Sequence, residues 1–442
     1  MNVILLSGGS GKRLWPLSNS VRSKQFIKLF TNELGEPESM LERVYRQIKQ
    51  VLPDAVITVA TEKSQVSAVR NQLGDAVHIC VEPCRKDTFP AIALATLYLT
   101  DVVGVGGEEP VVVCPVDSYV ESSYFKALEA LAQQVTEDTA NLHLLGIEPT
   151  YPSEKYGYII PKTDDTVAAV KTFKEKPSVT VAEQYIKEGA LWNGGIFAFR
   201  ASYLKDCVDD LLRLSSYDEL INAYDGLNAI SFDYAVVEQE HSIDVMRYNG
   251  VWMDLGTWNT LAEALHNPIN GNVKLDATCA STTVINELDI PIICMGLENA
   301  VVAAGPEGIL VADKHQSSYM KPLVEELTDP IRFAEKSWGE YRVIDVQESG
   351  TTIRVTLKPG HRMNYHSHER RDEIWTVIGG TGRAIIDSMS QSISAGDVIS
   401  IEAGCRHTVI ADTELALIEV QLGADIAVTD KTVYPWPENG DA

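Results

Sequence analysis

The residues with the most distinctive chemistry lie within the first thirty positions, where a glycine cluster is followed by basic side chains. Three glycines and three basic residues make up this set: Gly8, Gly9, Gly11, Lys12, Arg13 and Lys24. Glycines directly after a buried strand let backbone N–H groups approach a phosphate closely, and fixed cations stabilise the charge that develops when phosphorus is attacked. The spacing fits neither the dinucleotide-binding pattern nor the eight-residue P-loop. The set therefore predicts a phosphate-binding loop of a different type.

Two aspartates, Asp117 and Asp254, each end an apolar run that is typical of a buried strand. Carboxylates at the carboxyl edge of a parallel sheet lie where α/β proteins bind their ligands. A pair of carboxylates suits Mg²⁺, which prefers oxygen ligands. A lone aspartate is more often a turn or cap residue, so both interpretations stay open on the spacing alone.

Three of the nine histidines lie in the C-terminal part at spacings that resemble the two cupin motifs. With one glutamate they form the set His366, His368, Glu373 and His407. Histidines two positions apart on a strand point to the same face, and this mixture of nitrogen and oxygen ligands suits Zn, Mn, Fe or Ni. The alternative is a metal-free cupin that keeps these residues as a polar core, because spacing fixes geometry and not occupancy.

Short apolar runs that alternate with helical patterns must position the glycine loop and the two aspartates. The runs that predict strands are 2–6, 56–60, 78–81, 111–114 and 142–147, and those that predict helices are 40–51, 64–73 and 90–100. Strands alternating with helices imply a mostly parallel sheet with crossover connections. We therefore expect a Rossmann-like α/β domain over residues 1–268.

The composition changes after residue 268. Residues 269–330 predict a short β segment, with strand-sized apolar runs over 271–313 and a helix at about 317–327. Residues 331–442 carry regularly spaced turn signals, which predict a small β-barrel of the cupin type. The final residues, 435–442, predict a loose tail.

The bulk composition argues against several classes of protein. The 442 residues carry 37 basic and 62 acidic side chains, a formal net charge of −25, whereas a nucleic-acid or anionic-membrane partner needs basic patches. No apolar run reaches the roughly 18 residues of a membrane span. The seven dispersed cysteines indicate reduced thiols. We expect a cytoplasmic protein, in which local cations still allow a nucleotide to bind.

Residues 6–26 resemble the signature of the mannose-1-phosphate guanylyltransferases, a branch of the sugar nucleotidylyltransferases. Six later stretches resemble that family's motifs in the same order: 82–88, 115–117, 173–177, 191–197, 231–235 and 251–258. The resemblance covers residues 1 to about 265. It implies transfer of a nucleotidyl group from an NTP, most simply GTP, to a sugar 1-phosphate, most simply mannose 1-phosphate, with release of pyrophosphate.

The resemblance also implies a role for each candidate site residue. Arg13 and Lys24 would hold the triphosphate and the attacking phosphate, while Asp117 and Asp254 would hold Mg²⁺. The other implied positions form two groups, a nucleotide-binding pair beside the loop, Glu82 and Arg85, and a sugar-binding set, Gly157, Glu175, Lys176 and Asn193.

Four positions depart from the family's usual pattern: Ser23, where proline is usual, Asp87, Val116 and Ser118. The transfer chemistry is expected to survive these changes, because the basic and acidic residues above remain. The base and the sugar are less constrained. Two alternatives therefore stay open: the same chemistry with another NTP or hexose 1-phosphate, and a non-catalytic regulator that senses a sugar or a metal.

The C-terminal part resembles the mannose-6-phosphate isomerase module that many of these guanylyltransferases carry. The family's arginine is kept at Arg371, but His366 and Ile374 replace its glutamine and its second histidine, and Tyr434 is not followed by the family's Gly-Arg. An isomerase and a non-isomerase cupin both stay open. The middle segment is expected to be structural, and a homo-oligomer contact is expected there.

Overall fold

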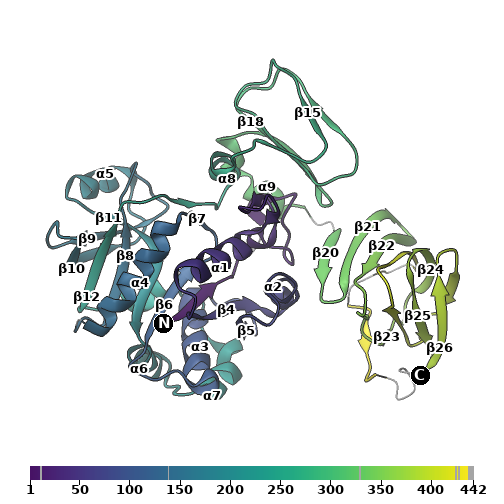
Figure 1. Ribbon diagram of the computed structural model, residues 1–442, viewed down its shortest axis with the longest axis horizontal. Helices are drawn as coiled ribbons and strands as arrows, with labels where there is room; N and C mark the ends of the chain where they lie inside the picture. The colour runs from purple at the N-terminus through teal and green to yellow at the C-terminus, as the bar shows by residue number, and fades with distance from the viewer. Residues whose placement is uncertain (10–11, 138, 328–329, 424–425, 427–428, 437–442) are drawn as a thin grey trace. The chain divides into compact units, whose positions relative to one another are not determined.

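The computed structural model describes residues 1–9, 12–137, 139–327, 330–423, 426 and 429–436 (Figure 1). Contacts between Cα atoms group the chain into two compact units. The first unit holds Met1–Arg13 and Ser23–Asn267, and the second holds Leu14–Arg22 and Pro268–Ala442. The chain therefore leaves the first unit for nine residues and then returns to it. The three-part division drawn from the sequence stays a prediction.

A nine-stranded sheet forms the centre of the first unit, in the order β5-β4-β1-β6-β11-β8-β12-β10-β9. Its strands are β1 (Asn2–Leu6), β4 (Val56–Glu62), β5 (His78–Glu82), β6 (Pro110–Pro115), β8 (Leu142–Ile147), β9 (Gly157–Pro161), β10 (Val167–Lys174), β11 (Leu191–Arg200) and β12 (Ile243–Tyr248). The β5-β4-β1-β6 half is parallel, as the alternation of strands and helices predicts. The other half is mixed, because β10 and β11 run opposite to the remaining strands.

Helices cover both faces of this sheet: α1 (Met40–Val51), α2 (Val66–Leu73), α3 (Thr88–Tyr98), α4 (Ser122–Glu137), α5 (Val179–Lys187), α6 (Ala201–Leu212) and α7 (Tyr217–Ala223). The first unit also contains α8 (Trp258–Ala264). Side chains alternate across β1, so Val3 and Leu5 pack in one core with α1 and α4, while Ile4 packs in the other with α3 and α6. The sheet therefore separates two apolar cores. Two short ribbons lie beside it: β2 (Phe30–Thr31) with β3 (Pro37–Glu38), and β7 (Ser118–Val120) with β13 (Trp252–Asp254).

The middle segment of the second unit consists of stacked parallel strands. Strand β14 (Ile269–Asn270) pairs in parallel with β16 (Thr283–Asn286), which pairs in parallel with β18 (Ala300–Gly305). Strands β15 (Val273–Leu275) and β17 (Ile292–Cys294) form a second parallel pair, and β19 (Gly308–Asp313) closes the edge antiparallel to β18. The expected all-β segment is confirmed, and it coils so that every second strand stacks.

The helix expected at 317–327 is broken. The structure has a 3-10 turn at Gln316–Tyr319 and a short helix, α9 (Lys321–Glu325). Pro322 explains the break, because proline has no N–H to donate and its ring clashes with the preceding turn. It is tolerated only in the first turn of α9.

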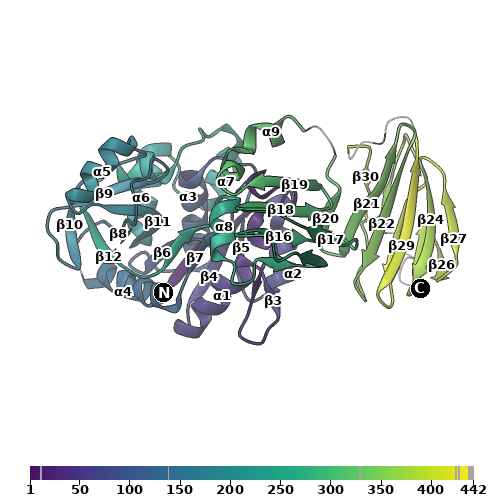
Figure 2. The ribbon, with the colours of Figure 1, turned by 90° about the horizontal axis from the view of Figure 1, so that it is seen from above.

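Two antiparallel sheets make up the C-terminal barrel (Figure 2). One contains β20 (Phe333–Lys336), β21 (Gly339–Gln347), β22 (Gly350–Leu357), β29 (Leu415–Leu422), β24 (Asp372–Gly379) and β27 (Val398–Ile401). The other contains β26 (Met389–Ser394), β25 (Thr381–Ile386), β28 (His407–Ala411), β23 (His366–Ser367) and β30 (Thr432–Val433). Their inner faces share an apolar core that includes Leu357, Trp375 and Val409. The expected cupin fold is confirmed. Across the described ranges, no helix is long and apolar enough to cross a membrane.

Candidate active site

A buried polar network holds the glycine loop at the end of β1. Gly8 and Gly9 are exposed, and Gly9 has φ +145°, a conformation that favours glycine. The carbonyl of Ser7 accepts a hydrogen bond from Gln25 Nε2 (2.8 Å), and the carbonyl of Gly9 accepts one from Ser23 Oγ (3.1 Å). Gly11 lies outside the described residues, and the side chain of Lys12 is likewise not described. The visible part of the loop presents its backbone to solvent, as phosphate binding requires.

Lys24 and the two aspartates meet beside this loop. Asp117 lies two residues after the end of β6. Asp254 ends β13, which pairs with β7 so that Asp254 lies opposite Ser118. The Lys24 Nζ lies 2.9 Å from Asp117 Oδ2 and 3.9 Å from Asp254 Oδ1, and it donates to the carbonyl of Leu255. The pairing of β7 with β13 therefore brings Asp117 and Asp254, which are distant in sequence, to the same Lys24 ammonium group.

The shared Lys24 charge acts unequally on the two carboxyls, so their pKa values move apart. Burial raises the pKa of both. At Asp117 the effect of burial is outweighed by the charge and hydrogen bond of Lys24 together with a backbone hydrogen bond and the charge of Arg13, so the pKa of Asp117 is lowered. At Asp254 the negative charge of Asp117 adds to burial, so its pKa is raised. Arg13, exposed on the 3-10 turn Lys12–Leu14, acts at a longer range and favours the charged form of both carboxyls.

A second cluster gathers the residues implied to hold the sugar. Asn193 on β11 pairs opposite Gly157 on β9, and Glu175 follows β10, the other neighbour of β9. A Cβ at Gly157 would lie 2.5 Å from Glu175 Oε2, so only glycine allows this carboxylate to approach so closely. Lys176 forms an ion pair with Glu175. All four predicted sugar-binding residues thus lie on neighbouring strands or directly after one, and their roles stay predictions.

Asp233 belongs to this cluster and was not singled out by the sequence. Its carboxylate accepts a hydrogen bond from Asn193 Nδ2 (2.6 Å). Burial and then the charge of Glu175 raise the pKa of Asp233 to about 6. The signal was present in the family-like stretch 231–235, but no spacing rule connects a residue of that stretch to Asn193, forty positions earlier.

The predicted nucleotide-binding residues Glu82 and Arg85 lie at the end of β5 and three residues beyond it. Arg85 forms an ion pair with Glu62, and Glu82 is buried and accepts a hydrogen bond from Tyr224 Oη (2.8 Å). Burial, partly offset by that hydrogen bond, raises the pKa of Glu82 to about 7. Near pH 7 the buried Glu82 carboxyl is therefore close to half ionised. Its contact with a nucleotide stays a prediction.

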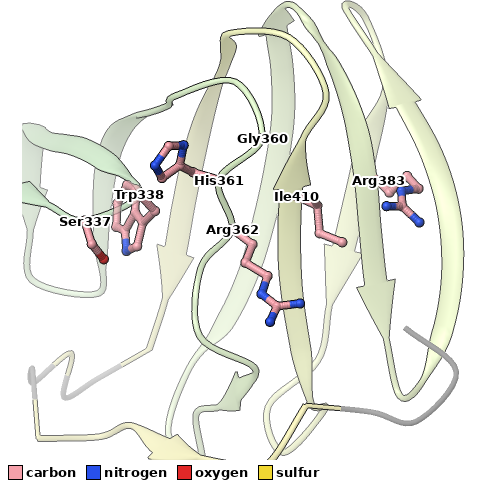
Figure 3. A pocket seen from close by; sticks show the side chains of 7 residues that line it. All are labelled: Ser337, Trp338, Gly360, His361, Arg362, Arg383 and Ile410. Carbon is pink, nitrogen blue, oxygen red and sulfur yellow. The ribbon is translucent and has the colours of Figure 1, made fainter. Parts of the chain in front are cut away.

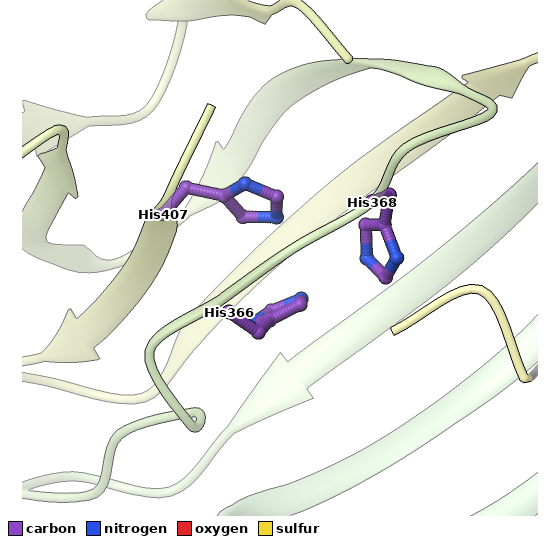
Figure 4. A group of neighbouring side chains, drawn as sticks. All are labelled: His366, His368 and His407. Atoms are coloured by element: carbon purple, nitrogen blue, oxygen red, sulfur yellow. The ribbon is translucent and has the colours of Figure 1, made fainter. Parts of the chain in front are cut away.

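The barrel contains a separate candidate metal site. His366, His368 and His407 are buried, and one nitrogen of each lies within 4.8 Å of those of the other two (Figure 4). Glu373 reaches two of them, with Oε1 3.2 Å from His368 Nε2 and Oε2 3.3 Å from His407 Nε2. The four residues expected to bind a metal are therefore brought together.

The histidines are oriented through their Nδ1 atoms. Each Nδ1 lies at hydrogen-bond distance from a backbone carbonyl, of Asn364, Asp430 or Cys405. This fixes the tautomer with Nδ1 as donor and leaves Nε2 as the metal-binding lone pair. Burial lowers the pKa of His366 to about 2, which keeps that ring neutral, as a ligand must be.

Two further features complete the electrostatics of the barrel. Arg371 contacts both His368 Nε2 (2.9 Å) and Glu373 Oε1 (3.2 Å), so a metal at His368 must share this nitrogen or displace the arginine. His407 Nε2 is buried and has no hydrogen-bond partner within the part of the chain that the structure describes. A buried ring nitrogen that makes no hydrogen bond with any described residue, and that lies 3.3 Å from Glu373 Oε2 among the other candidate ligands, is what a metal site requires.

The outer surface of the barrel also carries a cavity of about 390 Å³. Figure 3 shows the Arg362 and Arg383 side chains on opposite sides of Ile410, with Trp338 and His361 at the other end. The guanidinium groups do not converge on a common ligand position. This cavity lies apart from the histidine cluster, and no role is assigned to it.

Comparisons with known proteins agree with this geometry. Residues 2–270 match the family described as nucleotidyl transferase, and residues 326–433 match the family described as mannose-6-phosphate isomerase C-terminal.

Two relatives match over nearly their whole length. Xanthan biosynthesis protein XanB of Xanthomonas campestris is 31% identical over 97% of this chain and 96% of its own. Mannose-1-phosphate guanylyltransferase ManC of Salmonella typhimurium is 29% identical over 97% of this chain and 96% of its own. Among solved structures, one titled mannose-1-phosphate geranyltransferase from Thermus thermophilus matches with a TM-score of 0.61 and 27% identity, covering 74% of this chain and 99% of that one.

Proposed function

We infer that this chain, which belongs to the nucleotidyl transferase family, transfers a nucleotidyl group from a nucleoside triphosphate to a sugar 1-phosphate and releases pyrophosphate. One observation carries the proposal: Lys24, held between Asp117 and Asp254, lies beside an exposed glycine loop. We propose GTP and mannose 1-phosphate as the substrates. The names of relatives that match over nearly their full length support this choice, and so does the isomerase-like C-terminal part.

In the proposed reaction, an oxygen of the sugar phosphate attacks the α-phosphorus in line, and the bond from that phosphorus to pyrophosphate breaks. The backbone N–H groups of Gly8 and Gly9 bind phosphate oxygens. Lys24 and Arg13 supply positive charge where negative charge develops. Glu175 and Asn193 orient the sugar by its hydroxyl groups, which brings the attacking phosphate to a fixed position.

The two aspartates fit a divalent cation. Their side chains are about one-third exposed, 37% for Asp117 and 35% for Asp254, and they already share the charge of one ammonium group. Oxygen ligands of this kind suit Mg²⁺. We propose that Asp117 and Asp254 hold Mg²⁺ when the nucleotide binds, where it would offset phosphate charge.

The test is a substrate panel. Four NTPs are combined with several hexose 1-phosphates and Mg²⁺, and pyrophosphate release is measured. We expect the highest kcat/KM with GTP and mannose 1-phosphate, and we expect Asp254→Ala to lower kcat by at least about 10²-fold, because it removes charge that acts on the transition state. A different best pair would replace the proposed substrates. Ligand binding with no pyrophosphate release would favour a non-catalytic regulator.

A second candidate activity belongs to the barrel. The buried histidine–glutamate set, with each Nδ1 fixed by a carbonyl, favours a divalent transition metal and with it the isomerisation of mannose 6-phosphate and fructose 6-phosphate. We expect the purified chain to carry close to one metal ion, and His407→Ala to lose both the metal and isomerase turnover while pyrophosphate release stays unchanged. Metal without isomerase turnover would leave a non-isomerase cupin. Cytoplasmic location and a homo-oligomer stay predictions.

A further inference from the structure

Ser23 occupies the position before Lys24 where the resembling family has proline, and the structure gives its hydroxyl two partners. Ser23 Oγ donates to the carbonyl of Gly9 (3.1 Å) and accepts from Gln65 Nε2 (2.7 Å). A serine hydroxyl has one proton and two lone pairs, so both contacts are satisfied at once. The hydroxyl therefore bridges the glycine loop to the segment after β4.

The far end of this bridge is also fixed. Gln65 Oε1 accepts a hydrogen bond from Thr61 Oγ1 (3.1 Å), which directs the amide nitrogen towards Ser23. Ser23, Gln65 and Thr61 are completely buried. In such surroundings each hydrogen bond is retained, because water is not present to replace a missing partner. The orientation of the Gly9 carbonyl is thus set by three buried side chains in series.

We propose that Ser23 is a positioning residue for the nucleotide, held by Gln65, and that this pair sets the glycine loop relative to the adjacent Lys24. The inference rests on the proposed function, since it assigns the loop to the triphosphate. Holding the Gly9 carbonyl restrains the backbone of Gly9, because in a planar peptide unit the carbonyl turns only when the Cα–C bond turns. The N–H groups of Gly8 and Gly9 are then arranged before the phosphates arrive, which reduces the cost of binding them.

The backbone at this position provides a sharp test. Ser23 has φ −73° and ψ 159°, and the proline ring also holds φ near −65°. Ser23→Pro therefore removes the hydroxyl while keeping the backbone conformation that the family's residue would adopt. Ser23→Ala removes only the hydroxyl oxygen, and Gln65→Met removes the amide at nearly constant length. Thr58→Val is the matched control, because Thr58 lies on the same strand as Thr61 and its buried hydroxyl has no hydrogen-bond partner among the described residues.

The experiment measures the Kd of GTP by calorimetry, and the KM of each substrate and kcat by pyrophosphate release, for all variants and the double variant Ser23→Ala/Gln65→Met. We expect each single change to weaken GTP binding about tenfold, which corresponds to about 1.4 kcal/mol. The KM of mannose 1-phosphate should change less than about twofold, and the double variant should be no weaker than the worse single variant, because both changes break one chain of hydrogen bonds.

Three results would overturn the inference. These are an unchanged Kd in Ser23→Ala, equal rises in the KM of both substrates, and strict additivity in the double variant. A general loss of packing lowers the Tm without separating the two substrates, so the split between their KM values excludes a merely structural role. If the parent chain binds GTP but releases no pyrophosphate, the proposed function fails, whereas the Kd comparison still decides the role of Ser23.

Discussion

At the scale of single residues, the candidate site is organised by pairs whose partners lie far apart in sequence. Asp117 and Asp254 have their pKa values moved in opposite directions because one lies closer to Lys24. Asp233 and Glu82 have raised pKa values for a different reason, which is burial. With pKa values of about 6 and about 7, Asp233 and Glu82 titrate near neutral pH, so we expect the protein's stability to depend on pH in this range.

Glu82 provides a test of that dependence. Its pKa rises from 4.5 to about 7 in the folded protein, so the folded state binds the proton more tightly than the unfolded state. Stability is therefore lost as the pH rises from about 4.5 to about 7, by at most roughly 3 kcal/mol. Glu82→Gln removes this loss and still accepts the hydrogen bond of Tyr224. We expect its Tm to exceed that of the parent at pH 8, with the gap closing towards pH 5.

The matched control for this prediction is Glu183→Gln, which neutralises an exposed glutamate on α5. It changes the net charge by the same amount but is expected to leave the Tm nearly unchanged at both pH values. A gap for Glu82→Gln that is the same at pH 5 and pH 8 would show that ionisation of this carboxyl is not the cause.

The sequence predicted the charged residues of the site better than their supports. Asp117 and Asp254 follow apolar runs, so their positions near the ends of strands could be inferred, whereas Lys24 was singled out by the family-like signature of residues 6–26. The support by Ser23 and Gln65 could not, because buried polar contacts between residues 42 positions apart leave no local pattern. Resemblance to a family marked Ser23 as a departure but did not supply its partner.

At the scale of elements, the sugar-binding cluster depends on how closely β9 approaches the end of β10. Gly157 on β9 faces Glu175, and a Cβ there would lie 2.5 Å from the carboxylate and 2.9 Å from the ring of Phe173. Both distances are shorter than real carbon atoms allow. Gly157 therefore permits the Glu175 carboxylate to lie against β9, directly beside the position opposite Asn193.

Gly157→Ala is expected to displace Glu175 and raise the KM of the sugar 1-phosphate by about tenfold or more, with a smaller change in the KM of the NTP. Steady-state kinetics with each substrate varied in turn provides the measurement. Gly226→Ala is the control, because no atom lies within 4 Å of a Cβ at that position. Equal effects of the two substitutions would contradict the proposed role of the close approach.

The elements themselves were predicted unevenly. Five strands of the large sheet (β1, β4, β5, β6 and β8) and helix α1 were predicted nearly at their bounds, because buried runs and a capped amphipathic helix are local signals. The helix at 90–100 begins two residues earlier, at Thr88, and changes after Tyr98 into a π-helical turn, Leu99–Val103. The parallel stacking of the middle segment was not predicted, because strand pairing between successive coils is not encoded in the order of apolar residues.

At the scale of the whole molecule, Leu14–Arg22 separates Arg13 from Lys24 and yet belongs to the second unit. Arg22 forms a two-point ion pair with Glu287, at 2.7 and 3.1 Å. Asn19 Nδ2 donates to Glu307 and to the carbonyl of Phe333. Contacts inside the second unit therefore fix the segment that lies in sequence between Arg13 and Lys24, two residues of the candidate active site.

Glu287→Ala tests whether this anchoring matters for the transferase. The Arg22 and Glu287 side chains are only 12% and 23% exposed, so an unpaired guanidinium should cost about 1–3 kcal/mol of stability. We expect a lower Tm and a raised KM of the NTP, since Lys24 follows Arg22 by two residues. Glu325→Ala breaks an exposed ion pair with Lys321 and should change neither. A loss of stability with an unchanged KM would limit Arg22 to a structural role.

The excursion of Leu14–Arg22 also constrains how such a chain can be rearranged by recombination. A crossover near residue 268 would exchange Glu287 and Glu307 while retaining Arg22 and Asn19 from the other parent. The two partners of each contact would then come from different parental sequences. A viable chimaera must take residues 14–22 and the residues after 268 from the same parent. For recombination, the chain therefore consists of two units interleaved in sequence, and a single crossover cannot exchange one of them intact.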